Sequence, residues 1–240
     1  YLYKDGDKIY KLSDLIFELG KIKELKRIRY TTSHPRDMTS DLIELYKISK
    51  KLMPLVHLPI QSGSNKILKL MNRKHTINEY LNIFDKLKNI NSKIEFSSDF
   101  IIGYPGEDEQ NFKETLEIIK KIKFINSYSF IYSSRPGTVA ANLKTIDQKI
   151  LAQRLKEVQN ELFENQILMN KSLENKILSV LVENLTKDKS QVFGRSEYMT
   201  PVIFNGKKSD IGKIVSVKIE KSNRSTLFGK LINNFTKKVA

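Results

Sequence analysis

The sequence contains no cysteine among its 240 residues. This absence excludes disulfide bonds, thiolate metal sites and cysteine nucleophiles within the chain. It is compatible with a cytosolic protein, and we expect a cytoplasmic location. No apolar stretch approaches the ~20 residues that a membrane-spanning helix needs, and the polar first residues show no signal-peptide pattern. We therefore expect no membrane partner.

Other common site signatures are also missing. The sequence has no P-loop, no HExxH zinc motif and no Ser–His–Asp spacing. Three histidines without cysteine do not indicate a zinc site, so no metal ligands are assigned. The first residue is Tyr1 rather than methionine, and we interpret this as the mark of an incomplete chain with further sequence upstream.

The chain has a large excess of positive charge. It carries 42 lysines and arginines against 27 acidic residues, which gives a net charge of +15 and a pI near 9.7. Such an excess indicates an anionic partner, most simply a nucleic acid. A lysine-biased proteome would produce much of the same charge without any function, because only 8 of the basic residues are arginines.

Hydrophobic periodicity predicts strands that alternate with helices over residues 1–144. We expect strands at 27–32, 55–60, 95–102 and 127–132, and helices at 13–19, 40–48, 76–87 and 108–122. Ser13 is expected to cap the first helix, with Gly20 just past its end, and Thr76 with Glu79 forms a capping box. Alternation of this kind is typical of parallel βαβ units.

A long helix is predicted next, and a small all-β domain after it. The helix should run over 145–173, beginning at a capping box on Thr145. The apolar period then becomes two, which predicts short strands at 177–183, 191–195, 201–204, 214–220 and 226–232. Five short strands suggest a small closed barrel of the OB-like kind, a common nucleic-acid platform. Residues 176–240 hold 13 basic against five acidic residues, although a solvated lysine-rich surface would show the same excess.

Polar clusters follow all four strands of the first region, at their carboxyl ends. Parallel α/β barrels bind ligands at that end. The candidate ligand-contacting residues are Ser33, Gln61, Ser98, Asp99 and Arg135. Because four strands contribute to this set, we expect a shared site at one mouth of an α/β wall.

Each cluster also has a purely structural interpretation. Asp99 either faces the barrel interior, where it can bind a cation, a hydroxyl or an amine, or faces a helix as a satisfied acid. Arg135 either holds a carboxylate or phosphate or forms an interdomain salt bridge. His34 either donates to a ligand or bonds within its turn, and Ser64 is expected to cap the next helix. The turn 103–106 either presents a ligand-binding helix start or is a plain tight turn.

Four strings carry a resemblance to a known family. They are RYTTSHPRD at 29–37, HLPIQSGS at 57–64, SSDFIIGYPGE at 97–107 and YSFIYSSRPGT at 128–138. Together they resemble the MiaB-type tRNA methylthiotransferases of the radical S-adenosylmethionine (SAM) superfamily. Gly194-Arg-Ser196 and Ile211-Gly212 look like the family's C-terminal TRAM domain, a small tRNA-binding β-barrel.

The resemblance implies a function. Enzymes of this family add a methylthio group to C2 of N6-isopentenyladenosine at tRNA position 37, in the anticodon stem-loop. One [4Fe–4S] cluster, on a CxxxCxxC motif, cleaves SAM reductively to a 5′-deoxyadenosyl radical, a second cluster supplies sulfur, and an electron donor is needed. SAM also supplies the methyl group. tRNA, SAM and two clusters are therefore the partner and cofactors that the resemblance implies.

In the family, both cluster-binding regions precede the first matching string. Neither region is present in this chain, which therefore departs from the family pattern. The resemblance therefore implies the second half of a radical-SAM barrel at 1–144, a connecting helix at 145–175 and a TRAM barrel at 176–240. Such a segment should be inactive alone. Ser33, Gln61, Ser98, Asp99 and Arg135 are carried over as SAM-contacting residues by their strand-tip positions, and no catalytic residue is assigned. The alternative is a non-catalytic tRNA-binding protein that has lost its cluster-binding half.

Overall fold

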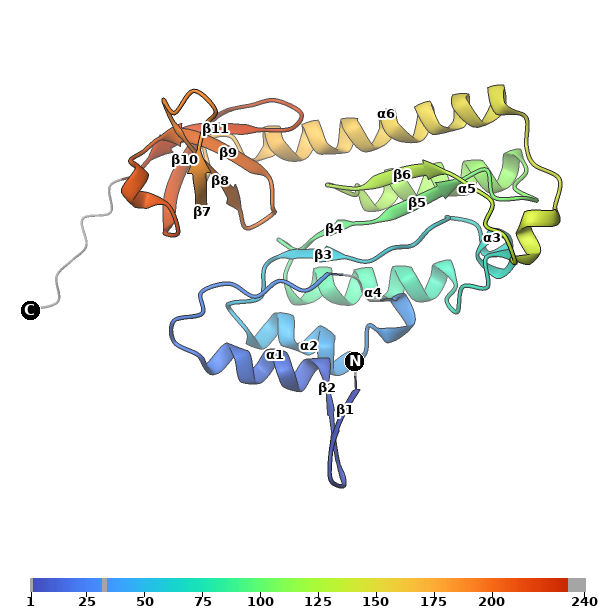
Figure 1. Cartoon of the computed structure of the whole chain (residues 1–240), viewed down its shortest axis with the longest axis horizontal. Helices are drawn as coiled ribbons and strands as arrows, with labels where there is room; N and C mark the ends of the chain where they lie inside the picture. Colours follow the sequence, from blue (N-terminus) through green and yellow to red (C-terminus); the bar gives the residue numbers. More distant parts are fainter. Residues whose placement is uncertain (1, 32–33, 233–240) are drawn as a thin grey trace, which may run out of the picture. The chain divides into compact units, whose positions relative to one another are not determined.

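The computed structural model describes residues 2–31 and 34–232. They form two compact units, unit 1 over Tyr1–Leu162 and unit 2 over Phe163–Ala240 (Figure 1). The boundary falls inside the longest helix, α6 (Gln148–Ser172). None of the described helices combines the length and apolar character that a bilayer crossing requires.

Unit 1 contains one wall of parallel strands. β3 (Leu55–His57) pairs with β4 (Glu95–Ser97), and β5 (Asp99–Ile102) pairs with β6 (Tyr128–Ile131), both in parallel. Single bridges extend this pairing, from Gln61 to Phe100 and from Ile28 to Leu52. The order is that of half a (β/α) barrel, so the predicted fold class is confirmed.

Helices connect these strands, as Figure 1 shows. The remaining elements of unit 1 are the hairpin β1 (Leu2–Asp5) and β2 (Lys8–Lys11), the helices α1 (Leu12–Lys21), α2 (Ser40–Ile48), α3 (Asn65–Leu70), α4 (Ile77–Ile90) and α5 (Glu109–Ile122), and the 3₁₀ turns Pro35–Asp37 and Val139–Asn142. The hairpin was not predicted. Its four-residue strands are exposed throughout and carry no core periodicity.

Two helix starts agree with the sequence signals. Thr76 caps α4 in a capping box with Glu79, as predicted. Asp108 caps α5, and its carboxylate accepts a hydrogen bond from the Asn111 backbone N–H at 2.9 Å. Carboxylates at this position also favour the positive end of the helix dipole.

Three predicted boundaries were wrong. Ser13 does not cap the first helix but lies inside α1, where its buried hydroxyl donates to Asp41 across to α2. Gly20 also lies inside α1. The long helix begins at Gln148 rather than Thr145, because the Asp147 side chain accepts a hydrogen bond from the Lys149 N–H. Residues near 27–32 contribute a single bridge at Ile28 instead of a strand.

The core of unit 1 lies between the strand wall and its helices. Phe100 on β5 and Phe124, just after α5, are both fully buried and meet edge to face at 5.3 Å between ring centroids. Tyr80 of α4 joins them and donates its hydroxyl to the Leu58 carbonyl at 2.8 Å. Burial of each large apolar side chain stabilises the fold by about 1.5–3 kcal/mol. Val158 of α6 completes this core.

Unit 2 is a closed five-stranded barrel. Its strands are β7 (Ile177–Leu185), β8 (Val192–Ser196), β9 (Pro201–Asn205), β10 (Ile214–Ser222) and β11 (Leu227–Leu231), in the order β10-β11-β9-β8-β7, with the 3₁₀ turn Lys208–Asp210 after β9. All five predicted strands are present. Gly194 and Gly229 permit tight curvature, because a Cβ at either would stand 2.3 Å from a carbonyl oxygen of the neighbouring strand.

The turn after β3 approaches α5 closely. The Gly63 N–H donates to the Thr115 hydroxyl at 3.0 Å. A Cβ at Gly63 would stand 2.5 Å from both the Glu114 carbonyl oxygen and the Thr115 Cα. The absence of a side chain at Gly63 therefore permits this close approach of the two backbones.

We predict that Gly63→Ala lowers the free energy of unfolding by about 1–3 kcal/mol, because α5 must move to admit the new methyl group. Denaturant unfolding of the whole chain measures the change. Gly20→Ala is the matched control. Its Cβ would meet only the Ser49 hydroxyl, at 4.0 Å, so a gain of about 0.5–1 kcal/mol is expected from helix propensity. Equal effects of the two substitutions would contradict this account.

Candidate functional site

The two faces of the strand wall differ in chemistry. Phe96 and Phe100 point toward the helices and are buried. Side chains alternate along a strand, so His57, Ser97 and Asp99 share the opposite face. His57 joins the other two, with Nδ1 2.9 Å from the Ser97 hydroxyl and Nε2 3.4 Å from Asp99 Oδ2. Asp99 therefore belongs to the interior face, one of the two orientations left open by the sequence.

Gln61 is locked beside Asp99 by the main chain. Its N–H donates to the Asp99 carbonyl at 3.0 Å, and its own carbonyl accepts from the Ile101 N–H at 2.9 Å. Its φ of 73° lies in the left-handed region, which is uncommon for a residue with a side chain and marks functional sites more often than core positions. The Gln61 side-chain amide makes no hydrogen bond with any described residue, so it remains open to a ligand.

Ser98 has a different role from its neighbour. Its side chain is fully buried, and its hydroxyl accepts a hydrogen bond from the Ile60 N–H at 2.9 Å and donates to the Asp99 carbonyl at 3.3 Å. The Ser98 N–H is bound by the Ser127 hydroxyl. Ser98 therefore ties three strand segments together and holds Asp99 in position.

Arg73 was missed by the sequence analysis. It follows α3 in a loop, where periodicity carries no signal, and its N–H bonds the Leu68 carbonyl at 2.8 Å. Partial burial lowers the pKa of Arg73, and the facing Asp99 carboxylate raises it again. The guanidinium makes no ion pair or hydrogen bond with any residue between 2 and 31 or 34 and 232. It is an available cation beside Asp99.

His34 and His75 form a pair of neighbouring rings. The rings of His34 and His75 meet edge to face at 5.2 Å. His34 Nδ1 accepts from the Arg36 N–H at 3.1 Å, which agrees with the turn interpretation of this residue. His75 is 6% exposed, and neither of its ring nitrogens has a hydrogen-bond partner among the described residues. His57 and His75 were also missed as site residues.

The electrostatics keep His75 neutral. The pKa of His75 is lowered from 6.5 to about 4, mainly by burial and then by the neighbouring His34 and Arg73, against opposing effects of the Ile60 backbone and Glu79. Burial, followed by Arg73, also lowers the pKa of His34. Both imidazoles are therefore uncharged at neutral pH, and Arg73 provides the positive charge of this cluster.

Two predicted residues remain. Ser33 falls outside the described residues. Arg135 follows β6 and is exposed, and it makes no ion pair with any part of the chain that the structure describes. Its carbonyl accepts from the Thr138 N–H and hydroxyl, which closes a turn. The interdomain salt bridge considered for Arg135 is therefore not seen in the described residues.

The turn after β5 is closed by buried charges. The Glu107 carboxylate accepts from the Gly103 N–H at 3.1 Å and from Arg154 of α6 at 3.0 Å. Gly103 and Gly106 have φ of 75° and 92°, which glycine adopts without strain. Because the Gly103 N–H is used internally, this segment is a tight turn rather than an anion site.

Ser64, expected to cap α3, occupies the cap position, but its hydroxyl instead accepts from Asn111 at 3.0 Å.

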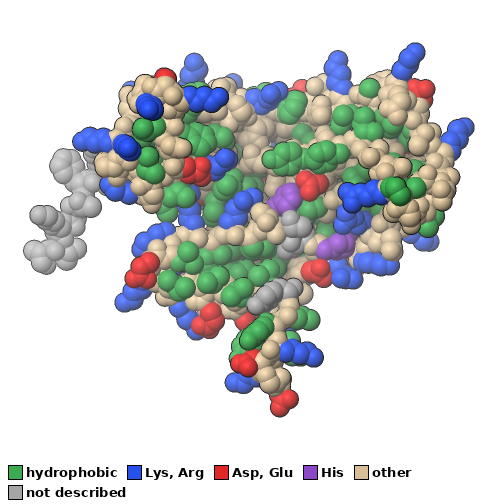
Figure 2. Space-filling model, viewed as in Figure 1, with side chains coloured by type: hydrophobic (Ala, Val, Ile, Leu, Met, Phe, Trp, Pro, Cys, Tyr) green, Lys and Arg blue, Asp and Glu red, His purple; other side chains and the backbone are tan. Residues whose placement is uncertain are grey.

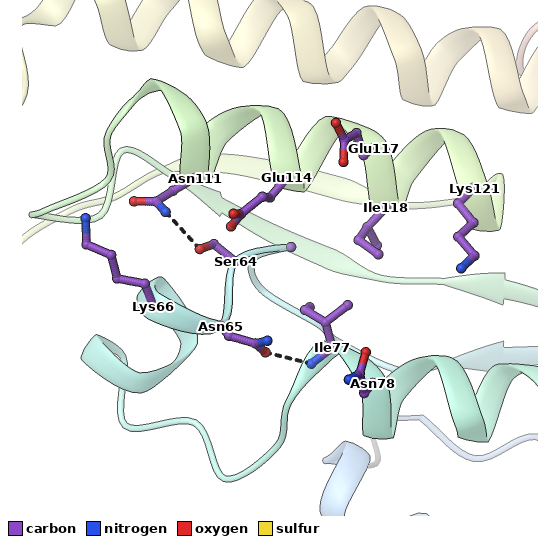
Figure 3. A pocket seen from close by; sticks show the side chains of 11 residues that line it. Ser64, Asn65, Lys66, Ile77, Asn78, Asn111, Glu114, Glu117, Ile118 and Lys121 are labelled. Atoms are coloured by element: carbon purple, nitrogen blue, oxygen red, sulfur yellow. Dashed lines mark hydrogen bonds between the residues drawn. The ribbon is translucent and has the colours of Figure 1, made fainter.

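A cavity lies beside Ser64 and Asn111, and its lining does not include His57, Gln61 or Asp99. Figure 3 shows a cavity of about 420 Å³ between the starts of α3 and α4 and one side of α5. Its lining includes Lys66 and Lys121 as well as Glu114 and Glu117. The balance of charges selects no class of ligand. No group of three potential metal ligands exists among the residues described.

Unit 2 presents a basic surface. Lys213, Lys230 and Arg195 are paired with acids of their own unit. Other exposed lysines have no ion pair with a described residue: Lys187, Lys189, Lys207, Lys208, Lys218 and Lys221. Most of them lie in the β7–β8 loop and after β9. Free cations in barrel loops are suited to a phosphate backbone.

Comparison with known proteins assigns both units. Residues 5–119 match the family model of the radical SAM superfamily, and residues 171–232 match that of the TRAM domain. The chain resembles coproporphyrinogen III oxidase from Escherichia coli, a radical SAM enzyme, with a TM-score of 0.52 at 14% identity over 92% of this chain and 56% of that one. This similarity supports the fold alone. The chain therefore contains one region similar to the radical SAM superfamily and one similar to the TRAM domain.

Similar sequences indicate a branch of the radical SAM superfamily. The chain is 66% identical over 240 residues to the tRNA-2-methylthio-N(6)-dimethylallyladenosine synthase of Pelagibacter ubique, covering 100% of this chain and 54% of the relative. The protein of the same name from Rickettsia canadensis is 47% identical over 94% of this chain and 51% of its own length. Within the superfamily, the chain is therefore similar to the MiaB-type tRNA methylthiotransferases, the family that its motifs indicated. It spans about half the length of the curated relatives it matches.

Neutral His75 should make the stability of unit 1 depend on pH. The imidazole binds a proton more readily in the unfolded chain, where its pKa is near 6.5, than in the folded one, where it is about 4. Its contribution is fully present above pH 6.5 and is lost as the pH falls toward 4, with a loss on the order of 3 kcal/mol. Urea unfolding at a series of pH values tests this. His75→Phe should flatten the dependence, and an unchanged slope would contradict the assignment.

Proposed function

We propose that this chain provides the SAM-facing half barrel and the RNA-binding module of a tRNA methylthiotransferase, acting on C2 of N6-isopentenyladenosine at tRNA position 37 in the cytoplasm. The observation that carries the proposal is that Gln61, His57 and Asp99 are brought together on the parallel strand wall, in a chain similar along its whole length to synthases of that name. Residues 1–144 form the half barrel, 145–175 the connecting helix and 176–240 the RNA-binding barrel.

The available side chains fit SAM. This cofactor carries a carboxylate, an amine, ribose hydroxyls and an adenine ring. The unpaired Arg73 guanidinium suits the carboxylate, and the Asp99 carboxylate, 31% exposed and oriented by His57, accepts from hydroxyls or the amine. The open Gln61 amide offers both a donor and an acceptor. In this proposal Ser98 positions Asp99, and bound SAM supplies the methyl group and the radical chemistry.

The chain does not fit an iron–sulfur cluster. Clusters are held mainly by cysteine thiolates, and the sequence contains none. We propose that cysteines outside these residues hold the clusters of the active enzyme, and that an electron donor reduces them there. The 240 residues alone should therefore bind RNA without converting it.

The SAM assignment is tested in the gene product that contains these residues. After anaerobic reconstitution with iron and sulfide, it should convert tRNA bearing N6-isopentenyladenosine to the methylthio product, measured by nucleoside mass spectrometry. Asp99→Asn should raise the SAM concentration needed for half-maximal rate by about 10- to 100-fold, because a charged hydrogen-bond acceptor is lost.

Asp85→Asn is the matched control, because Asp85 is an exposed acid of α4 that makes no ion pair with a described residue. It should leave the SAM dependence unchanged. Equal behaviour of the two variants would refute the role of Asp99. A gene product without iron–sulfur absorbance that still binds tRNA would favour the alternative, a non-catalytic tRNA-binding protein.

The RNA-binding role is tested on four lysines of unit 2. They are the exposed, unpaired residues of two neighbouring loops, Lys187, Lys189, Lys207 and Lys208. Their replacement by Gln should weaken binding of a tRNA anticodon stem-loop and reduce the slope of log K against log salt by about 3, since each phosphate contact contributes about 0.7–0.9. Filter binding over a salt series measures both quantities.

A variant with the same charge change serves as its control. It replaces four exposed lysines of unit 1 by Gln, at Lys4, Lys8, Lys50 and Lys86. Its salt slope should stay near that of the parent chain. If both variants lose the same slope, binding follows net charge alone, and the assignment of unit 2 as the RNA-binding module fails.

A further inference from the structure

The interior face of the last two strands is left open. Phe100 and Ile102, which face the helices, are 0% exposed. On the other face, Tyr128 and Phe130 are 64% and 55% exposed. Two neighbouring aromatic side chains that are exposed on a regular strand do not contribute the stabilisation that burial would give. Their position therefore indicates a binding surface rather than a core.

The two rings are arranged as a platform. Their planes are nearly parallel, at 16°, and their centroids are 6.4 Å apart. Direct stacking contact needs carbon atoms at about 3.5–4 Å, so both rings keep free π-faces. Figure 2 shows hydrophobic side chains exposed over the strands of unit 1, beside a histidine and an acidic side chain.

The platform adjoins the proposed SAM site. The register pairs Tyr128 with Asp99 and Phe130 with Ile101. Paired residues of adjacent strands point to the same face about 5 Å apart. A planar group on Tyr128 would therefore lie beside the Asp99 carboxylate, and the Ile101 side chain would border it with apolar surface.

The same segment supplies polar groups for a nucleotide. The Tyr132 hydroxyl oxygen is buried and has no hydrogen-bond partner among the described residues. Arg135 is exposed and has no ion pair with any of them, and its guanidinium suits a phosphate. Aromatic rings on an open sheet, next to an unpaired arginine in a chain of net charge +15, have the chemistry that recognises unstacked RNA bases.

We propose that Tyr128 and Phe130 stack an unpaired adenine of an RNA loop beside the cofactor, with Arg135 on an adjoining phosphate. This inference rests on the proposed function and locates the substrate base within it. Arg135 then contacts RNA rather than SAM. Ile101 and Phe130 offer the apolar border that an alkyl group on the base would need.

Fluorescence of a base analogue tests the platform on the whole 240-residue chain. The probe is an anticodon stem-loop with 2-aminopurine at the position of the modified adenine. Binding should quench its fluorescence by stacking. Tyr128→Ala with Phe130→Ala should abolish the quenching at saturating protein and weaken affinity by about 5- to 100-fold, the range for loss of base–aromatic stacking. Unchanged quenching and affinity would overturn the proposal.

The hairpin at the start of the chain offers a matched control. Tyr3 and Tyr10 form another exposed ring pair, 6.2 Å apart and tilted by 34°. Replacing both by Ala removes the same number of aromatic groups and should leave quenching and affinity unchanged. Equal losses in the two double variants would overturn the proposal.

A second substitution separates stacking from simple apolar contact. Phe130→Leu keeps apolar bulk but removes the π-face, so quenching should fall as it does with Phe130→Ala. Full retention of quenching and affinity would mean that the face is an apolar docking surface, and the proposal would fail.

The lysine variant of unit 2 distinguishes this proposal from the proposed function. It should weaken overall affinity while leaving the quenching at saturation intact. RNA binding that depends on those lysines, without any change at the probe base, would overturn the platform alone. Absence of RNA binding by the parent chain would overturn both.

Discussion

The candidate site depends on one main-chain connection between neighbouring strand segments. Gln61 donates to Asp99 and accepts from Ile101, and these two hydrogen bonds continue the wall past the end of β3. They fix the carboxyl ends of two strand segments in one register. Asp99 then faces His57 and Arg73, and Tyr128 falls beside Asp99 on the next strand. Without this register, the polar side chains would lie on different faces, since a shift of one residue reverses every side chain.

Much of the architecture follows from patterns in the sequence. Periodicity of two and of 3.6 separated the strands from the helices, and the capping signal at Thr76 placed the start of α4. The five strands of the small barrel were predicted because each is flanked by turn residues and alternates in polarity. The errors came where tertiary contacts outweigh local preference, as at Ser13, whose hydroxyl bonds a neighbouring helix instead of its own backbone.

The site was only partly predictable, for a related reason. Gln61 could be found because it follows a hydrophobic strand, and Asp99 because it is a carboxylate within one. Arg73 follows a short helix, and only the folded chain brings it to Asp99. His57 reads as an ordinary strand residue until its face is known. The hydrogen bonds that occupy Ser98 also depend on three separate segments, so no local pattern distinguishes it from a ligand-contacting serine.

The two units differ in whether their sheets have unpaired edges. Every strand of the barrel in unit 2 has two neighbours, and closure leaves it no unpaired edge. In unit 1, β6 has only β5 as a partner among the described strands, so its outer row of amide and carbonyl groups is free to join another extended segment. Self-association in concentrated solution can therefore begin at an open edge such as that of β6, and shielding such an edge should improve solubility more than any change to the barrel.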